Sequence, residues 1–330
     1  MSVARIDVVG AGAWGTALAA LARENGCCVR LWAHEDEVAR TINAERENPR
    51  FLPGVSLPEG IEATSDIAAL GNGDAVLLAT PAQHLRRVTE TLAPHLERGR
   101  PVVICAKGIE QDSGALMSEV VADTLPEAPL AVLSGPTFAA EVARGRPTAV
   151  TIAAADPDIA DRLVAALGCP RFRPYAADDV VGAETGGALK NVIAIACGIV
   201  AGLELGQNAR AALITRGLAE ITRFALAKGG KAETLAGLSG LGDLVLTATS
   251  ETSRNYTLGL AIGRGETAAE FLAQRHTVAE GAYTAGAVTR LAGTLGIDMP
   301  VTAAVDRVIN HGADVAAVVE DILNRPFRRE

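Results

Sequence analysis

The stretch ARIDVVGAGAWGTALAALARE, residues 4–24, joins a short apolar run, a glycine-rich turn and a helical apolar stripe. The apolar residues around positions 6–9 predict a buried strand, and Gly10, Gly12 and Gly15 follow with the spacing G-x-G-x-x-G. A strand, such a turn and a helix in this order are typical of the first unit of a dinucleotide-binding fold. The stretch therefore predicts a nucleotide site near the start of the chain.

Each glycine of the turn has a separate physical role. Gly10 permits the tight turn, Gly12 lets the backbone approach a pyrophosphate, and Gly15 lets the helix pack closely on the strand. The helix start also presents free N–H groups and the positive end of its dipole to phosphate charge.

Composition narrows the class of protein. The 330 residues suggest two domains, and 49% hydrophobic residues provide a large core. A net charge of −9 and only 3% aromatic residues argue against nucleic-acid and anionic-membrane partners. No apolar segment reads as a bilayer span and the N-terminus lacks a signal-peptide layout, so we expect a cytoplasmic protein without membrane insertion. The 5 cysteines lack C-x-x-C spacing and indicate reduced thiols, with no metal site.

Apolar runs and helical patterns alternate over the first half of the chain. After the opening unit, strands are predicted at residues 28–32, 61–64, 75–79, 101–106, 130–133, 148–153 and 172–175, whereas 48–58 reads as a turn-rich loop. From about residue 178 the pattern is helical almost throughout. We therefore expect an α/β fold: a Rossmann-type doubly wound parallel sheet in a dinucleotide-binding domain (residues 1–180), followed by an all-α substrate-binding domain (residues 181–330).

The end of the strand at 28–32 is where such folds contact the adenosine ribose. An acidic residue there favours NAD by binding the 2′-hydroxyl. Glu35 lies one position beyond the usual place of this acid, directly after His34, and Arg30 and Arg40 are nearby. The sequence leaves NAD and NADP both open.

Lysine use is selective. Among 30 basic residues only four are lysines: Lys107, Lys190, Lys228 and Lys231. Guanidinium cannot lose its proton at neutral pH, so a sequence rich in arginine keeps lysine where an amine must do so. The last two lysines, in AKGGK, read as solvated loop charges, which leaves Lys107 and Lys190 as candidates for chemistry.

Lys107 follows a predicted parallel strand, at the edge where open α/β sheets bind ligands. The turn SGPTFA, residues 134–139, ends another strand at the same edge; Gly135 permits close backbone approach and Thr137 offers a hydroxyl. The alternatives are a solvated lysine and an ordinary capped turn.

Lys190 lies in ETGGALKN, on one helix face with Gly187 and Ala194. A face lined by glycine admits a ligand or another backbone, and an amine held there can have a lowered pKa. The alternative is a lysine that reaches solvent along the helix.

Two further motifs carry polar groups in apolar or glycine-rich settings. Asp243, in GLSGLGDL, needs a cationic partner or hydrogen-bond donors; it either positions the lysine or caps a helix. Ser253, Arg254 and Asn255 combine a hydroxyl, a forked cation and an amide, which suits a phosphate or carboxylate clamp or, alternatively, a helix start.

The motifs GAGAWGTALA, AKGIE, SGPTFAAE, GGALKNVIAIA, NARAALITRGLAE, GLGDLVLT, SRN and VAEG occur in order across nearly the whole chain. Together they closely resemble the bacterial NAD(P)-dependent glycerol-3-phosphate dehydrogenases. The resemblance implies a homodimeric cytosolic enzyme that interconverts sn-glycerol 3-phosphate and dihydroxyacetone phosphate and supplies the backbone of glycerophospholipids.

The resemblance also implies roles for individual residues. Besides the three glycines, the cofactor, NAD or NADP, is expected to contact Ala13, Trp14, His34, Lys107, Ala139, Arg254, Val278 and Glu280. The substrate is expected to contact Lys107, Gly135, Thr137, Lys190, Asn191, Asp243, Ser253, Arg254 and Asn255. Lys190 is expected to donate and accept the proton, with Lys107 and Asp243 as the other catalytic residues.

Two alternatives remain open on the sequence. Another NAD(P)-dependent dehydrogenase, acting on a 2-hydroxy acid or a sugar phosphate, keeps the cofactor site and changes only the clamp. A nucleotide-sensing protein without enzymatic activity needs the dinucleotide fold but not the two lysines, Asp243 and the SRN motif.

Overall fold

The computed structural model describes residues 3–273 and 279–326. The chain folds as two compact units. Unit 1 comprises Met1–Lys107 and Ala115–Glu184, and unit 2 comprises Gly108–Gly114 and Thr185–Glu330.

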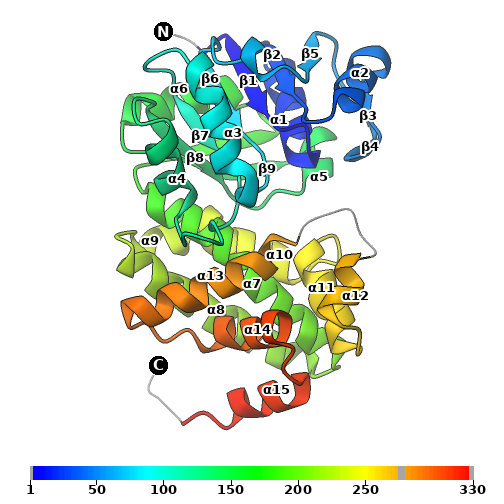
Figure 1. Ribbon diagram of the computed structural model, residues 1–330, viewed down its shortest axis with the longest axis vertical. Coiled ribbons are helices and arrows are strands. Elements are labelled where there is room, and N and C mark those ends of the chain that lie inside the picture. The colour runs from blue at the N-terminus through cyan, green and yellow to red at the C-terminus, as the bar shows by residue number, and fades with distance from the viewer. Residues whose placement is uncertain (1–2, 274–278, 327–330) are drawn as a thin grey trace. The chain divides into compact units, whose positions relative to one another are not determined.

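Unit 1 is built on a sheet of eight strands in the order β10-β9-β8-β7-β6-β1-β2-β5 (Figure 1). The strands are β1 (Arg5–Val9), β2 (Cys28–Trp32), β5 (Ile61–Thr64), β6 (Ala75–Leu78), β7 (Val102–Ile104), β8 (Leu130–Ser134), β9 (Thr148–Ala154) and β10 (Phe172–Ala177). Every neighbouring pair is parallel except β8 and β9, which are antiparallel. The prediction of a doubly wound, mostly parallel sheet is confirmed.

Both faces of this sheet are covered, which is why its strands appear as continuous apolar runs. Four helices pack with the face that carries Ile6 and Val8: α1 (Ala13–Glu24), α2 (Asp36–Glu45), α5 (Ala139–Ala143) and α6 (Pro157–Leu167). Two helices pack with the opposite face, which carries Val9 and Leu78: α3 (Leu85–Leu92) and α4 (Met117–Thr124).

A short hairpin replaces the loop that was expected at residues 48–58. It consists of β3 (Glu47–Asn48) and β4 (Leu52–Ser56), which pair antiparallel. Leu52 and Val55 are buried in the core around α1. The expectation of a plain loop was wrong because Pro53 and Gly54 are turn residues by propensity, whereas burial of their neighbours decides the structure.

Apart from the non-helical segment Gly108–Gly114, the described elements of unit 2 are helices. Its elements are α7 (Val180–Gly202), α8 (Gly206–Ala227), α9 (Ala232–Leu235), a π-helical turn η4 (Leu238–Gly242), α10 (Asp243–Ala248), α11 (Arg254–Gly263), α12 (Ala268–Ala273), α13 (Glu280–Leu295), α14 (Pro300–His311) and α15 (Val315–Leu323). The predicted helical C-terminal domain is confirmed in fold class. The residue 180 at which a domain boundary was predicted is the first residue of α7, and the compact units divide four residues later, at Glu184.

Helix α7 crosses α11 at close range because both helices carry glycine at the crossing. A Cβ atom on Gly198 would lie 2.1 Å from the carbonyl oxygen of Tyr256, and one on Gly259 would lie 2.0 Å from that of Ile195. No other residue fits at either position without moving the backbone. The crossing therefore fixes the start of α11, where Arg254 lies, against α7.

The same helix corrects the expectation that no segment is long and apolar enough to span a bilayer. Residues Val180–Gly202 meet that requirement by length and composition, but 89% of the apolar window is buried within the protein. A helix that is apolar all round and buried is a core helix. The apolar composition of α7 therefore reflects burial in the fold.

The five cysteines all lie in the described part of the chain and are free thiols. Burial raises the pKa of Cys105 and of Cys197 to about 12, so both remain protonated at neutral pH.

Candidate active site

The glycine turn at the end of β1 shows three different environments for its glycines. Gly10 has a φ of 113°, and a Cβ there would lie 3.0 Å from the backbone of Ala79. A Cβ on Gly15 would lie 1.8 Å from the carbonyl oxygen of Gly10. By contrast, a Cβ on Gly12 would meet nothing within 4 Å. The fold itself requires the outer two glycines, whereas the middle one leaves open space.

That open space lies where a dinucleotide fits. Gly12 is the N-cap of α1 and no side chain caps the helix there. Its turn lies between the ends of β1 and β6, and the strand order runs outward in opposite directions from this pair. Open α/β sheets bind ligands at such a switch point, and helix N-termini bind phosphate. The residues present therefore fit a pyrophosphate held by backbone N–H groups.

The other expected cofactor contacts of unit 1 are distributed around this turn. Trp14 is half-buried in the first turn of α1, and no described residue forms a hydrogen bond with its indole N–H. His34 is exposed beyond β2, with its ring 5.9 Å from that of Trp32. Ala139 begins α5 and packs against the core around α1. Val278 lies outside the described residues.

Lys107, Gly135 and Thr137 lie together at the carboxyl edge of the sheet. The Nζ of Lys107 donates to the carbonyl oxygen of Gly135 at 2.8 Å and to Thr137 Oγ1 at 3.3 Å. The lysine is half-buried. Gly135 has a φ of 151°, and its missing side chain makes room for Val150 of β9, 2.9 Å from a Cβ built there. Its glycine identity therefore serves the fold, while its carbonyl group orients the lysine.

Lys190 is buried and bound to an acid. Its side chain is 7% exposed and that of Asp243 is 0% exposed, and the two form an ion pair. The Nζ also donates to Thr247 Oγ1 at 2.9 Å. The hydroxyl of Thr247 in turn bonds back to the carbonyl oxygen of Asp243 at 2.7 Å. Lys190 thus does not reach solvent along its helix, and its amine is directed by two side chains of α10.

Glycines bring these groups into contact. A Cβ on Gly186 would lie 2.4 Å from the carbonyl oxygen of Ser239, so η4 packs with its backbone directly on α7. The π-type hydrogen bond from Gly242 N to Gly237 O, at 3.0 Å, shapes this turn and delivers Asp243 to the lysine. The glycine that receives another backbone is therefore Gly186, next to the Gly187 that was predicted to share a face with Lys190. Thr247 was missed in the sequence, although its spacing of four from Asp243 on a helix was visible.

The pair is energetically sensitive. Opposite charges in contact partly offset the free-energy cost of burying each other. Removal of one partner from a buried pair costs about 3–5 kcal/mol, because the other charge is left without compensation.

The motif Ser253–Arg254–Asn255 forms the start of α11. Ser253 Oγ accepts a hydrogen bond from the backbone N–H of Tyr256 at 3.2 Å, which is an N-cap contact. Asn255 is buried; its Nδ2 donates to Asn191 Oδ1 at 2.9 Å, and its Oδ1 accepts from Gly281 N at 3.1 Å. Asn191 and Asn255 therefore link α7, α11 and α13.

Arg254 projects from the same helix start and remains exposed. Partial desolvation of the Arg254 guanidinium lowers its pKa, and the charge of the Glu280 carboxylate opposes that shift. The arginine stays fully protonated at neutral pH. Unit 2 thus presents an exposed cation next to a buried amide pair.

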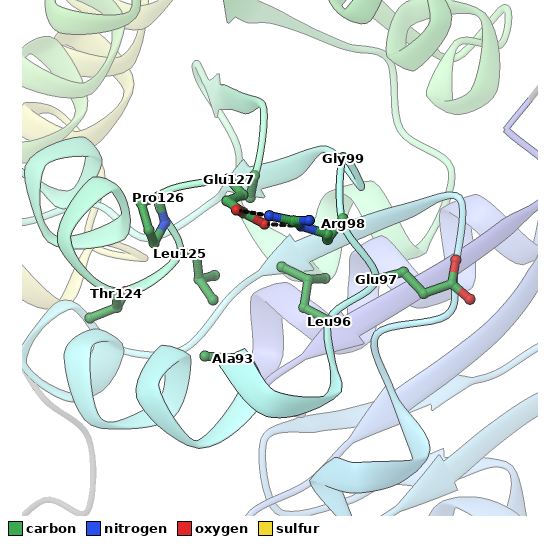
Figure 2. A pocket seen from close by; sticks show the side chains of 10 residues that line it. Ala93, Leu96, Glu97, Arg98, Gly99, Thr124, Leu125, Pro126 and Glu127 are labelled. Atoms are coloured by element: carbon green, nitrogen blue, oxygen red, sulfur yellow. Dashed lines mark hydrogen bonds and ion pairs between the residues drawn. The ribbon is translucent and has the colours of Figure 1, made fainter.

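Unit 1 also contains a separate pocket of about 220 Å³. It is lined by Ala93, Leu96, Glu97, Arg98, Gly99, Thr124, Leu125, Pro126, Glu127 and Ala128. These residues precede β7 and β8, at the amino edge of the sheet, and Figure 2 shows Arg98 and Glu127 paired across it. Parallel sheets bind ligands at the carboxyl edge, so this pocket does not belong to the site.

Solved structures share this architecture. Glycerol-3-phosphate dehydrogenase from Coxiella burnetii superposes with a TM-score of 0.93 at 41% identity, covering 97% of this chain and 99% of that one. The enzyme from Saccharomyces cerevisiae superposes with a TM-score of 0.85 at 28% identity. A ketopantoate reductase from Ralstonia eutropha gives a TM-score of 0.58 at 17% identity, which shows a shared fold alone.

Sequence comparisons agree. Residues 5–160 match the family model for the N-terminus of NAD-dependent glycerol-3-phosphate dehydrogenase, and residues 179–320 match the model for its C-terminus. The glycerol-3-phosphate dehydrogenase [NAD(P)+] of Rhodospirillum rubrum is 61% identical over 326 residues, 98% of this chain and 93% of the relative. That of Parvibaculum lavamentivorans is 54% identical over 99% of this chain and 98% of the relative. The chain therefore belongs to the NAD-dependent glycerol-3-phosphate dehydrogenase family.

Proposed function

We propose that this protein is an NAD(P)-dependent oxidoreductase that interconverts sn-glycerol 3-phosphate and dihydroxyacetone phosphate. The observation that carries the proposal is the buried Lys190, held by Asp243 and Thr247, in a chain 61% identical to an enzyme of that name. The direct test is turnover of dihydroxyacetone phosphate with NADH and with NADPH.

We assign the cofactor to the glycine turn of unit 1. When bound, the nicotinamide cofactor supplies the hydride that reduces C2 of dihydroxyacetone phosphate and accepts one from glycerol 3-phosphate in the reverse direction. Gly12 leaves the backbone accessible to the pyrophosphate, and the start of α1 provides N–H donors and a positive dipole end.

We assign proton donation and proton acceptance to Lys190. In reduction its ammonium group donates a proton to the carbonyl oxygen of the substrate as C2 is reduced; in oxidation the neutral amine accepts the proton of the C2 hydroxyl. Asp243 keeps the amine in place and stabilises its charged form, and Thr247 orients it. Lysine is suited to this cycle because an amine exchanges protons under conditions in which guanidinium does not.

We assign Lys107 a second cationic contact with the same substrate. Its amine is oriented by Gly135 and Thr137 rather than extended into solvent, as expected for a group that stabilises developing negative charge on oxygen. The resemblance of the AKGIE and SGPTFAAE motifs to those of the family supports this role.

The phosphate is assigned to Arg254, the exposed cation at the start of α11. We expect Arg254→Ala to raise KM for dihydroxyacetone phosphate by about ten- to a hundredfold, because a charge-assisted contact of about 1.5–3 kcal/mol is lost. The KM for dihydroxyacetone, which has no phosphate, should change little. Steady-state kinetics on both ketones provide the measurement.

Arg264→Ala is the matched control, since Arg264 is an exposed arginine at the opposite end of α11. It should leave both KM values unchanged. If Arg254→Ala raises KM for both ketones to the same extent, Arg254 does not recognise the phosphate.

The resemblance further supports a cytoplasmic homodimer that supplies glycerol 3-phosphate for phospholipid synthesis. We expect light scattering coupled to gel filtration to give twice the 33.9 kDa of one chain; a mass of 33.9 kDa at micromolar concentration would exclude the dimer.

A further inference from the structure

The hairpin β3–β4 is attached directly to the glycine turn. Asn48 is buried, and its Nδ2 donates to the carbonyl oxygen of Ala11 at 2.8 Å and to Thr16 Oγ1 at 2.9 Å. Its Oδ1 accepts from the backbone N–H of Phe51 at 3.2 Å. The residues between Asn48 and Phe51 are therefore held at a fixed place relative to the turn that we assign to the cofactor.

One of those residues is Arg50, and it reaches the end of β2. Its Nη2 lies 3.4 Å from Glu35 Oε1, with side chains that are 54% and 36% exposed. The guanidinium carbon also lies 5.1 Å from the centre of the Phe51 ring. Glu35 follows His34 directly, at the position where dinucleotide folds contact the adenosine ribose. A cation and an acid thus share the region that distinguishes a 2′-hydroxyl from a 2′-phosphate.

Arg50 is the arginine best placed for this role. Arg40 pairs with Asp36 at 3.0 Å on its own helix. Arg30 donates to the carbonyl oxygen of Ala69 at 2.7 Å and lies near Glu62. Neither of these two arginines is paired with Glu35 in the described structure, whereas Arg50 is.

There is also room beside the pair. A cavity of about 140 Å³ is lined by Glu37, Val38, Thr41, Asn48, Pro49 and Arg50. One water molecule takes about 30 Å³ in the liquid, so the cavity holds more than a single solvent molecule. Arg50 therefore borders open space between the hairpin and α2.

We propose that Arg50 and Glu35 together determine the relative affinity for NAD and NADP. Arg50 binds the 2′-phosphate of NADP, and Glu35 accepts a hydrogen bond from the 2′-hydroxyl of NAD. This assignment rests on the proposed cofactor site at the glycine turn.

The electrostatics of the pair explain how both cofactors are accepted. With NAD, the Glu35 carboxylate accepts a hydrogen bond from the ribose 2′-hydroxyl, and Glu35 remains paired with Arg50. With NADP, an isolated carboxylate would repel the phosphate, but Arg50 turns from Glu35 to the phosphate, where its forked donors suit the oxygen geometry. This movement of Arg50 is possible because its side chain is 54% exposed.

The test measures cofactor affinity in the absence of substrate. Arg50→Gln is expected to weaken NADPH binding by about ten- to a hundredfold, since it removes a charge-assisted contact and leaves Glu35 to repel the phosphate. NADH binding should change by less than about threefold, because the Glu35 oxygen remains available. Glu35→Gln should have the opposite effect, strengthening NADPH and weakening NADH. Fluorescence titration of each reduced cofactor gives the four dissociation constants.

Arg40→Gln is the matched control: it removes the same charge from an exposed ion pair on α2 and should leave both affinities unchanged. If Arg50→Gln weakens NADH and NADPH equally, or affects neither, the assignment of Arg50 is overturned while the cofactor site stands. If the wild-type protein binds neither cofactor, the proposed function fails, and this inference with it.

Discussion

Replacement of Lys190 by methionine is expected to lower kcat in both directions by at least about a hundredfold and up to about ten-thousandfold, the usual contribution of general acid–base catalysis. Methionine roughly preserves the length of the side chain but removes the amine that exchanges the proton. Lys190→Arg should fail almost as badly: it keeps a charge next to Asp243, but guanidinium cannot accept a proton at neutral pH. The measurement is kcat for reduction and for oxidation in the wild type and both variants.

Folding must be separated from chemistry here, because Lys190→Met leaves the buried Asp243 without its cation. Thermal denaturation of each variant provides that check, and the arginine variant keeps a cationic partner for the acid. A folded Lys190→Arg protein with near-wild-type kcat would show that position 190 supplies only charge, and the proton role would pass to another group.

The second large effect is expected at the glycine turn. Gly12→Val should abolish detectable binding of NADH and NADPH and leave the fold intact. A Cβ at Gly12 meets no protein atom within 4 Å, so the added side chain occupies only the space assigned to the pyrophosphate. Fluorescence titration of the reduced cofactors and thermal denaturation of the same sample measure the two properties independently.

Gly15→Val is the contrasting variant. A Cβ there would lie 1.8 Å from the carbonyl oxygen of Gly10, so the strand and helix must move apart and stability should fall. Unchanged NADH and NADPH affinity in a folded Gly12→Val protein would remove the pyrophosphate from this turn.

The sheet could be predicted from the sequence because its strands are buried on both faces and therefore stand out as apolar runs. The hairpin β3–β4 could not, since Pro53 and Gly54 suggest a turn and the burial of Leu52 depends on a distant helix. The same limit applies to α7. Its apolar sequence is compatible with a membrane or a protein core, and only the surrounding helices decide for the core.

Individual site residues were easier to recognise than their partners. Lys190 and Asp243 stood out as charges in apolar surroundings, and contact with the lysine was one of the two roles expected for Asp243. The turn η4, which brings the two together, is a backbone shape that no local pattern specifies. For Thr247 the sequence offered only its spacing of four residues from Asp243 on a helix. For Gly135 the glycine identity indicated a close approach, and the fold accounts for one, because a Cβ there would lie 2.9 Å from Val150.

Cofactor choice was open for a related reason. The ribose end of β2 offered an acid, Glu35, with Arg30 and Arg40 nearby, but these two arginines pair with Glu62 and Asp36. Arg50 reaches Glu35 from a hairpin fifteen positions further along the chain, and Asn48 fixes that hairpin on the glycine turn. Contacts of this kind depend on tertiary structure.

The most direct test of the proposed activity is a steady-state assay of dihydroxyacetone phosphate reduction by the wild-type protein, with NADH and NADPH in parallel and a 2-keto acid as the competing substrate. We predict oxidation of the reduced cofactor with dihydroxyacetone phosphate, formation of sn-glycerol 3-phosphate, and little turnover of the 2-keto acid. Preferential reduction of the 2-keto acid, or binding of cofactor without turnover of dihydroxyacetone phosphate, would contradict the assignment.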